Sequence, residues 1–159
     1  MVGRVRPSAR GLFKIGKEIL RHVLRRPVIG ISAFATTGDG RILLIRRGDT
    51  GQWALPGGTV EWGESLRKTA VRELLEEAGV TQVKLGDLLG VYSAPERDPR
   101  FHAVTIVVAA EIGEPTGWPD NPTEILEARL FERGELPQHL SHGNKDMLDH
   151  ALSNTIVWE

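Results

Sequence analysis

One segment, from Gly57 to Val80, constrains the fold of this chain more than any other. Ser65 is of a residue type that caps helix N-termini, and Gly79 is of the type that ends helices in the left-handed conformation. Between them, charged residues alternate with apolar residues at helical spacing, so we expect a helix that ends near Ala78 and buries one face. The expected buried stripe consists of Leu66, Ala70, Val71, Leu74 and Ala78.

Strand-forming sequences lie on both sides of this helix. The segment 28–36 is apolar and rich in β-branched residues, and Gly38-Asp39-Gly40 predicts a hairpin turn into a return strand over 41–46. Strands and one central helix predict a mixed α/β or α+β layered domain. The pattern further downstream predicts three strands and a final helix, over 83–92 with an interruption near Gly86, 102–110, 126–131 and 142–153.

The chain has 159 residues, which is enough for one domain with its own hydrophobic core. It has no cysteine, which excludes disulfides and thiolate zinc sites and fits a cytoplasmic location. No apolar run reaches the roughly 18 residues needed to cross a bilayer, and the N-terminus lacks the apolar centre of a signal peptide. We therefore expect no membrane association.

The first 26 residues differ from the rest in charge. They carry a net charge of +7, whereas residues 27–159 carry −8. Apolar residues recur at helical spacing from Leu12 to Leu24, so we interpret residues 1–26 as a basic arm with an amphipathic helix attached to a main domain of residues 27–159. This helix would dock on its own domain or on a second subunit, giving a homodimer. A basic surface for RNA or acidic lipid is the alternative.

Three glutamates of the central helix share one side. Residues four apart lie on the same face of a helix, so Glu73 and Glu77 project together, with Glu76 beside them. Like charges at this spacing repel each other, and carboxylate oxygens are hard ligands that suit Mg²⁺ or Mn²⁺. Because Mg²⁺ usually shares its sites between carboxylates and substrate phosphates, the cluster indicates a phosphate-containing substrate. A solvated acidic face is the alternative.

The residues around these glutamates follow a fixed pattern. Five residues separate Gly58 from Glu64, seven more lead to Arg72-Glu73, and the sequence continues as Leu-Leu-Glu-Glu-Ala-Gly-Val. This resembles, at every specified position, the Nudix hydrolase signature G-x5-E-x7-R-E-U-x-E-E-x-G-U, in which U is a bulky apolar residue. The similarity spans about Val28 to Phe131. It implies an α/β/α sandwich built on a mixed sheet, in which the signature forms a loop, a helix and a loop.

The resemblance implies hydrolysis of a nucleoside diphosphate linked to another group, with Mg²⁺ or Mn²⁺ as cofactor. The two glycines would let the backbone turn sharply so that a carbonyl can ligate the metal. Arg72 would pair with Glu64 and hold the carboxylates in place, although a pair that merely stabilises the fold is also consistent with the sequence. The implied metal ligands are Gly57, Gly58, Glu73, Glu76 and Glu77.

The general base stays open at this point. In the mechanism that the family implies, metal ions neutralise the diphosphate and acidify a water, and a carboxylate takes its proton. The carboxylate candidates are Glu76 and Glu77 in the signature, and Glu124 in the loop 118–124, with Asp120 and Glu127 behind it.

A second stretch bears on the substrate. Arg97-Asp98-Pro99-Arg100-Phe101-His102 resembles the R-D-P-R-x-H stretch of many ADP-ribose and nucleotide-sugar pyrophosphatases of this family. Arg97 and Arg100 would donate to phosphate, or the stretch would be a polar loop with local ion pairs. Trp53 and Trp118 are candidates for stacking on the base, and Trp53 fits equally well beside the signature in the fold.

The leading interpretation is a Mg²⁺-dependent pyrophosphohydrolase for ADP-ribose or another nucleoside diphosphate sugar. A nucleoside triphosphate pyrophosphatase that removes damaged dNTPs is the nearest alternative. An RNA 5′-end pyrophosphohydrolase aided by the basic arm, and a binding module of the same fold without turnover, are the others.

Overall fold

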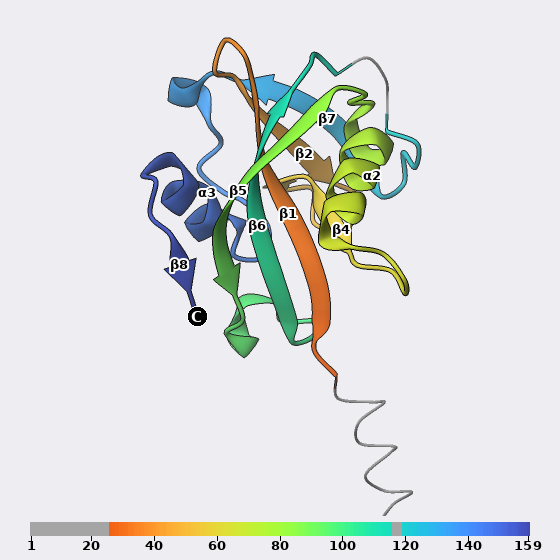
Figure 1. Ribbon diagram of the computed structural model, residues 1–159, viewed down its shortest axis with the longest axis vertical. Coiled ribbons are helices and arrows are strands. Elements are labelled where there is room, and N and C mark those ends of the chain that lie inside the picture. Colours follow the sequence, from red (N-terminus) through yellow and green to blue (C-terminus); the bar gives the residue numbers. More distant parts are fainter. Residues whose placement is uncertain (1–25, 116–118) are drawn as a thin grey trace, which may run out of the picture.

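The computed structural model describes residues 26–115 and 119–159 (Figure 1). The predicted N-terminal helix lies outside these residues. The described residues form eight strands, two α-helices and two short 3-10 helices, in the order β1 Val28–Thr37, β2 Ile42–Arg47, β3 Trp53–Ala54, β4 Gly57–Thr59, α2 Leu66–Ala78, β5 Val83–Tyr92, η1 Pro95–Arg97, β6 Ala103–Ile112, β7 Ile125–Phe131, η2 Arg133–Glu135, α3 Asn144–Leu152 and β8 Val157–Trp158. No helix among the described residues is long and apolar enough to span a membrane.

All eight strands belong to one mixed sheet. Its order is β3-β2-β1-β6-β5-β8, while β4 pairs with β1 and β7 with β2. The long central strands β1 and β6 run parallel, in register from Val28 opposite Ala103 to Thr37 opposite Ile112. The β5–β8 pair is also parallel, and the other pairs are antiparallel. The predicted mixed sheet is therefore confirmed.

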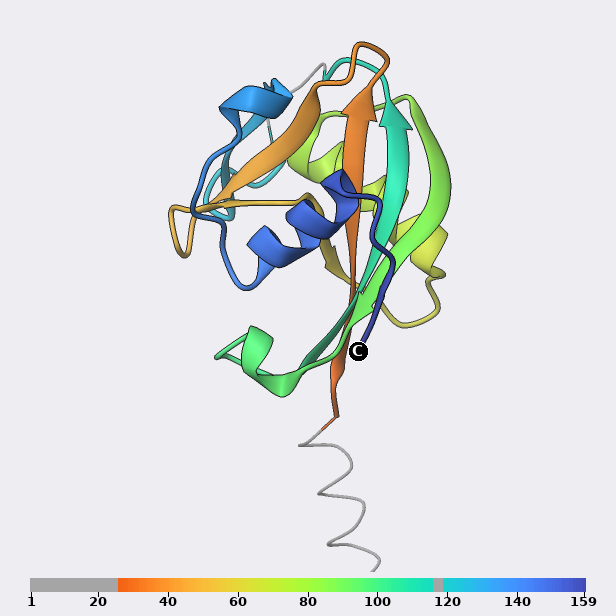
Figure 2. The ribbon, with the colours of Figure 1, turned by 90° about the vertical axis from the view of Figure 1, so that its left-hand side faces the viewer.

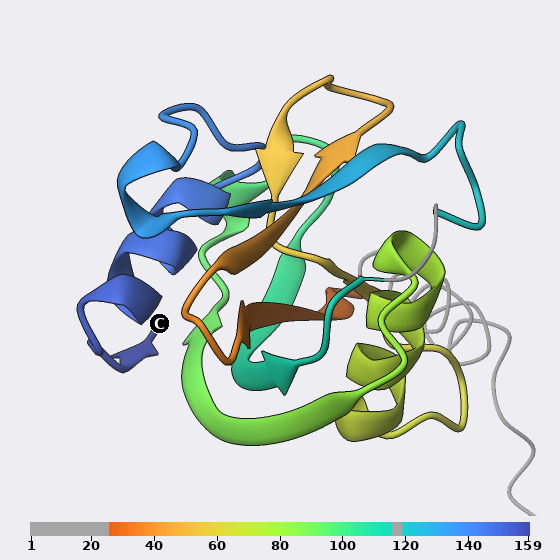
Figure 3. The same cartoon turned by 90° about the horizontal axis from the view of Figure 1, so that it is seen from above.

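The two α-helices cover opposite faces of this sheet (Figures 2 and 3). Because side chains alternate along a strand, β1 directs Ala33 and Ala35 into the core beneath α2 and Phe34 into the core beneath α3. Leu74 of α2 and Leu148 of α3 are fully or almost fully buried at the centres of these two cores. One sheet between two helical layers is the arrangement expected from the sequence.

Helix α2 begins and ends at the predicted residues. The hydroxyl of Ser65 accepts a hydrogen bond from the Lys68 backbone N–H, and Gly79 takes the left-handed conformation with φ 63°. The buried face is rotated from the predicted stripe, however: Leu66 and Val71 are exposed, whereas Glu77 is buried. The sheet therefore contacts a face of α2 that includes one of the three glutamates.

Two further predictions need correction. Strand β5 is not interrupted near Gly86, because it runs without a break from Val83 to Tyr92. Its pairing with β6 changes register between Leu85 and Leu88 and again between Leu88 and Gly90. The segment Gly57–Thr59 is not a turn but the short strand β4, paired with β1. The sequence pattern also missed β8, which pairs with two residues of β5.

Candidate active site

A cavity of about 650 Å³ lies beside α2 and β4 and extends to the loop after β5 and the start of α3. A cavity of this volume accommodates a ligand of nucleotide size. One end is acidic, and α2 and the loop before β7 supply its carboxylates. The side chains at this acidic end are Glu73, Glu76, Glu77 and Glu124.

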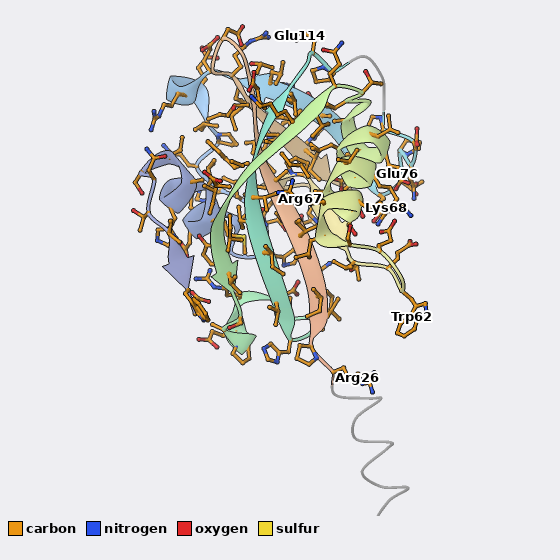
Figure 4. The ribbon with its side chains drawn as sticks, viewed as in Figure 1. Arg26, Trp62, Arg67, Lys68, Glu76 and Glu114 are labelled. Carbon is orange, nitrogen blue, oxygen red and sulfur yellow. The ribbon has the colours of Figure 1, made fainter. Side chains whose placement is uncertain are left out.

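Arg72 connects the carboxylates at the acidic end. Its Nη1 donates to Glu73 Oε1 at 2.9 Å and to Glu76 Oε2 at 3.0 Å, and its Nη2 donates to Glu64 Oε2 at 3.1 Å. The hydrogen bonds from Arg72 lower the pKa of Glu64, and they raise the pKa of Arg72 itself. The predicted pair of Arg72 and Glu64 is therefore present, and it belongs to a larger group of contacts on the side of α2 that carries Glu76 (Figure 4).

Glu77 lies deeper than the other carboxylates. Its side chain is buried, and Oε2 accepts a hydrogen bond from the Gly57 backbone N–H at 2.8 Å. Burial raises the pKa of Glu77 well above its usual value, the Gly57 N–H opposes this, and the nearby charge of Glu73 adds to it. Burial likewise raises the pKa of Glu73, against the opposing effect of Arg72. Both carboxyl groups are therefore placed where an added cation would stabilise their charged forms.

The two glycines of β4 allow a close approach of three elements. A side chain at Gly57 would overlap the backbone of Ile31 and Ser32 on β1, and one at Gly58 would overlap the Glu73 carboxylate. Close packing of strand and helix, together with the φ of 155° at Gly57, explains glycine here. Both residues line the cavity, and their role as carbonyl ligands of a metal stays a prediction.

The loop before β7 supplies the fourth carboxylate. Glu124 is exposed, lies directly before Ile125, and borders both the main cavity and a smaller one of about 80 Å³. Asp120 borders only the smaller cavity, and its backbone N–H donates to the Glu76 carbonyl at 2.8 Å. Glu127 instead pairs with Arg46 and Arg129, away from both cavities. Trp118 lies outside the described residues.

A second part of the cavity wall is formed by three segments that are distant in sequence, one of which lies next to Glu124 because the Gly48 backbone N–H donates to the Glu124 carbonyl at 2.7 Å. Arg100 donates to Asp98 Oδ2 at 2.8 Å and to Asp49 Oδ2 at 2.9 Å. Arg47 donates to the same Asp49 oxygen at 2.8 Å, and His142 lies beside this group at the start of α3. We call Arg47, Asp49, Asp98, Arg100 and His142 the balanced cluster, because two arginines face two aspartates.

Two predicted substrate contacts do not line the cavity. Arg97 stacks over the Tyr92 ring and pairs with Glu159 and Asp146. Trp53 packs edge-on against Phe131, with ring centroids 4.8 Å apart. Of the four predicted substrate-binding residues, the structure thus places Arg100 at the cavity, Arg97 and Trp53 elsewhere, and leaves Trp118 undescribed.

The donor set at the acidic end suits a divalent cation. No three Asp, Glu or His side chains of the described residues converge as a ready-made metal site, and Arg72 is hydrogen-bonded to both Glu73 and Glu76. Mg²⁺ does not need such convergence, because it keeps several waters and binds through one or two carboxylates together with substrate phosphates. Buried Glu77 and half-buried Glu73, with raised pKa values, are the residues that fit it best.

Sequence reasoning did not single out several cavity residues. Arg47, His142, Asn144 and Met147 all line the cavity; Arg47 ends β2, His142 precedes α3, and Asn144 and Met147 lie in its first half. Asn144 accepts a hydrogen bond from the Leu55 backbone N–H at 2.9 Å and so ties the start of α3 to the segment before β4. The one local signal in the sequence was the polar run Ser141-His142-Gly143-Asn144 before an apolar helix.

The family model described as the NUDIX domain matches residues 26–151 of this chain. The chain belongs to the Nudix family. The match includes every residue that lines the cavity, and also Asp49, which belongs to the balanced cluster but does not line the cavity.

Individual Nudix proteins resemble the chain to different extents. The ADP-ribose pyrophosphatase of Methanocaldococcus jannaschii is 43% identical over 105 residues, which are 63% of this chain and 59% of that protein. This chain spans 41% to 59% of the length of three curated relatives that it matches.

Solved structures support the same fold. The MutT NUDIX hydrolase from Burkholderia pseudomallei has a TM-score of 0.67 at 34% identity, over 79% of this chain and 98% of that one. An ADP-ribose pyrophosphatase from Streptococcus suis has a TM-score of 0.69 at 22% identity, over 84% of this chain and 100% of that one, and shows the fold alone.

Proposed function

We propose that this Nudix protein hydrolyses the diphosphate bond of a nucleoside diphosphate linked to a sugar, with Mg²⁺ as cofactor and ADP-ribose as the leading substrate. One observation carries the proposal: a single cavity of about 650 Å³ joins the acidic end to a second, hydrogen-bonding end. The acidic end suits a cation-bound diphosphate, and the rest of the cavity volume leaves space for the groups attached to it.

The residues of the acidic end have separable tasks in this reaction. When bound, Mg²⁺ would neutralise the diphosphate oxygens and lower the pKa of a bound water. Glu73 and Glu77 would hold the cation, and Arg72 would keep Glu73 and Glu76 in position through the contacts of 2.9 and 3.0 Å. The water oxygen forms a bond to one phosphorus, the bridging P–O bond breaks, and the products are a nucleoside monophosphate and a sugar phosphate.

Glu124 is the general base that we favour. Glu77 is committed to the Gly57 N–H and Glu76 to Arg72, whereas the Glu124 carboxylate is exposed at the cavity edge and accepts from Asn121. A carboxylate oxygen that is open to solvent and beside the metal-binding glutamates can take the proton of the attacking water.

The choice of substrate has two supports. The M. jannaschii relative is named ADP-ribose pyrophosphatase, and this chain shares 43% identity with it over 105 residues. The stretch Arg97–His102 resembles the one found in ADP-ribose and nucleotide-sugar pyrophosphatases, and its Arg100 and Asp98 line the cavity. Neither of these residues belongs to the group of glutamates, so we propose that they contact the substrate beyond the diphosphate.

A substrate screen with product identification tests the proposal. The panel contains ADP-ribose, nucleoside diphosphate sugars, dNTPs and RNA with a 5′-triphosphate, each with Mg²⁺ and with EDTA. We expect EDTA-sensitive release of AMP and ribose 5-phosphate from ADP-ribose. Pyrophosphate release from a dNTP, or processing of RNA that is lost on removing residues 1–26, would favour those alternatives. Binding without turnover of any compound would indicate a binding module.

A further inference from the structure

Helix α2 covers only part of its face of the sheet. Ala33 and Ala35 of β1 pack beneath α2, and the alternation of side chains along the strand directs Ile29 to the same face. In Figure 1 the lower parts of β1, β6 and β5 face the viewer, and no element of the described residues lies in front of them. Ile29 is accordingly 42% exposed, although β1 lies in the middle of the sheet.

One apolar row crosses four strands of this uncovered area. Ile106 of β6 lies opposite Ile31 of β1, which alternates with Ala33 on the same face. Val91 of β5 lies opposite Ile106, and Trp158 of β8 lies opposite Val91. Residues that lie opposite each other point to the same face of a sheet, so the whole row faces the α2 side.

Two more apolar side chains flank this row. Val104 lies opposite Ile29, and Leu88 lies opposite Val108, which packs on the core beneath α2. We call the exposed and partly exposed apolar side chains of this area the open face: Ile29, Leu88, Val91, Val104, Ile106 and Trp158.

The open face is a contiguous apolar patch. Trp158 is 91% exposed and Leu88 is 50% exposed, while the side chains between them are partly buried. Single exposed apolar residues are ordinary on a protein surface, but a contiguous patch indicates an area that another segment or molecule covers.

The N-terminal segment of the chain joins the sheet at the border of the open face. The described residues begin at Arg26, and β1 begins at Val28, directly before the open-face residue Ile29. The sequence predicts an amphipathic helix over residues 12–24, so only residues 25–27 connect it to β1. Three residues span at most about 10 Å, which keeps the end of this predicted helix close to Ile29.

The predicted helix matches the open face in size and in chemistry. A helix over residues 12–24 is about 20 Å long, and the distance from β1 to β8 across β6 and β5 is about 14 Å. Its apolar stripe suits the apolar patch, and its basic side chains would lie on the solvent side. The first 26 residues carry a net charge of +7 against −8 for the rest of the chain, which favours their association.

We propose that residues 12–24 fold back as a helix and pack their apolar stripe on the open face of their own chain. The stripe consists of Leu12, Ile15, Ile19 and Val23. A short connection gives a tethered segment an effective concentration of about millimolar, above that of a second copy in dilute solution. The basic arm is then a third helical layer of the domain, and its apolar side chains are not available to a lipid surface or to RNA.

The proposed contact also supports the cavity from behind. Gly30 and Thr105, which alternate with open-face residues along β1 and β6, line the cavity on the other face of the sheet. The helix would therefore cover the reverse side of one cavity wall. The inference does not depend on the proposed function, and its tests measure no turnover.

Introduced thiols test whether the open face is covered, because the natural chain has no cysteine. Ile29→Cys lies on the open face and Val71→Cys on the outer side of α2, and both native side chains are 42% exposed without the helix in place. In the full chain we expect Ile29→Cys to react with an aromatic disulfide reagent about tenfold more slowly than Val71→Cys, since its thiol is reached only when the helix opens. Equal rates, or a slower reaction of Val71→Cys, would overturn the inference.

A pair of double variants tests whether the apolar stripe provides the cover. Adding Ile15→Gln and Ile19→Gln to Ile29→Cys should raise its reaction rate to that of Val71→Cys, and glutamine keeps a good helix propensity. The matched control adds Lys14→Gln and Arg21→Gln, on the opposite side of the predicted helix, and should change the rate by less than about twofold because exposed charges are screened. A rate that responds to neither pair, or equally to both, would contradict docking through the stripe.

Chemical cross-linking decides between the chain itself and a second copy. Ile15→Cys and Val91→Cys are combined in one chain and treated with a short reagent that joins two thiols. We expect a bridge within one chain, seen by mass spectrometry of the monomer, and much less bridging when Lys14→Cys replaces Ile15→Cys. A bridge that links two chains would assign the open face to a second copy, and no bridging at all would contradict the contact.

Discussion

The two ends of the cavity differ in how the charges of their side chains are compensated. At the acidic end, four glutamates meet one arginine, and burial raises the pKa of two of those glutamates. At the balanced cluster, arginine and aspartate side chains neutralise each other within the protein. The acidic end is therefore complete only with an added cation, whereas the charges of the balanced cluster are already paired.

From this difference we expect one part of the cavity to serve the chemical step and the other to serve substrate recognition. An uncompensated negative charge attracts a metal ion, and the bound metal ion can in turn hold the phosphates of the reacting bond. A neutral, hydrogen-bonding surface contributes less affinity but discriminates between substrates, since only matched hydrogen bonds are gained there. Changes at the acidic end should therefore affect turnover, and changes at the other end should affect substrate affinity.

The largest effect is expected for Glu77→Gln. The amide keeps the size of the buried side chain and an oxygen for the Gly57 N–H, but it removes the charge that would hold Mg²⁺. We expect kcat with ADP-ribose at saturating Mg²⁺ to fall by about 10²-fold or more. Steady-state kinetics over a range of Mg²⁺ measures this, with the exposed Glu132 changed to Gln as control. An unchanged kcat would remove Glu77 from the metal site and with it the contrast between the two ends.

Glu124→Gln should follow closely. If Glu124 takes the proton of the attacking water, its amide lowers kcat by about 10²-fold while KM changes little. Glu127→Gln is a matched control, because Glu127 lies three residues further along and pairs with Arg46 outside the cavity. A loss of activity in both variants, or in neither, would return the role of base to Glu76.

Two arginines of one loop offer a smaller and sharper test. Arg100 lines the cavity and Arg97 does not, although both lie in the stretch Arg97–His102 that resembles ADP-ribose and nucleotide-sugar pyrophosphatases. Arg100→Ala should raise KM for ADP-ribose several-fold with kcat nearly unchanged, whereas Arg97→Ala should lower the melting temperature and leave KM within about twofold. The reverse pattern would place the substrate against Arg97 and contradict the cavity assignment.

The smallest effect is expected at Glu159, whose carboxylate accepts hydrogen bonds from Arg97 and from the Ser93 and Ala94 backbone N–H groups. These bonds, chiefly that from Arg97, hold the pKa of Glu159 at about 2. Because the pKa of Glu159 is lower in the folded state than in the unfolded state, its ionised carboxylate stabilises the fold at pH values above the usual pKa of a glutamate. This stabilisation is lost as the pH falls toward 2.

Unfolding by denaturant at several pH values measures this contribution. Glu159→Gln should be about 1 kcal/mol less stable than the wild type at pH 7, since the pair is partly exposed. The gap should close between about pH 4.5 and pH 2. A gap that is independent of pH would mean that packing, and not charge, accounts for the loss.

The sequence revealed most of the acidic end because three of its four glutamates lie on one helix. Spacings of three and four residues determine which side chains share a face, and Ser65 and Gly79 mark where the helix begins and ends. The same local reasoning identified the strands β1, β2, β6 and β7 to within one or two residues. Local periodicity contains this information without any knowledge of the tertiary structure.

Tertiary contacts explain what the sequence could not show. Whether the buried face of α2 includes Glu77 or Val71 depends on how the helix is rotated over the sheet, and hydrophobic periodicity alone does not determine that. The balanced cluster joins Asp49, Arg100 and His142, which meet only because three separate loops converge. Likewise, nothing in the stretch Arg97–His102 distinguishes the arginine at the cavity from the one bound to Glu159.

The parallel pairing of β1 with β6 has a consequence for how the chain acquires its site during synthesis. Strand β1 begins at Val28, and its parallel partner begins only at Ala103. While the intervening residues emerge from the ribosome, one edge of β1 has no strand beside it, and open strand edges invite pairing with other chains. Gly57 and Gly58, which line the acidic end, lie in β4, and β4 pairs with the opposite edge of β1. A nascent chain that stalls before β6 would thus contain the signature helix and its glutamates on a sheet that lacks the partner of β1. We expect such truncated chains to aggregate before they can bind nucleotide.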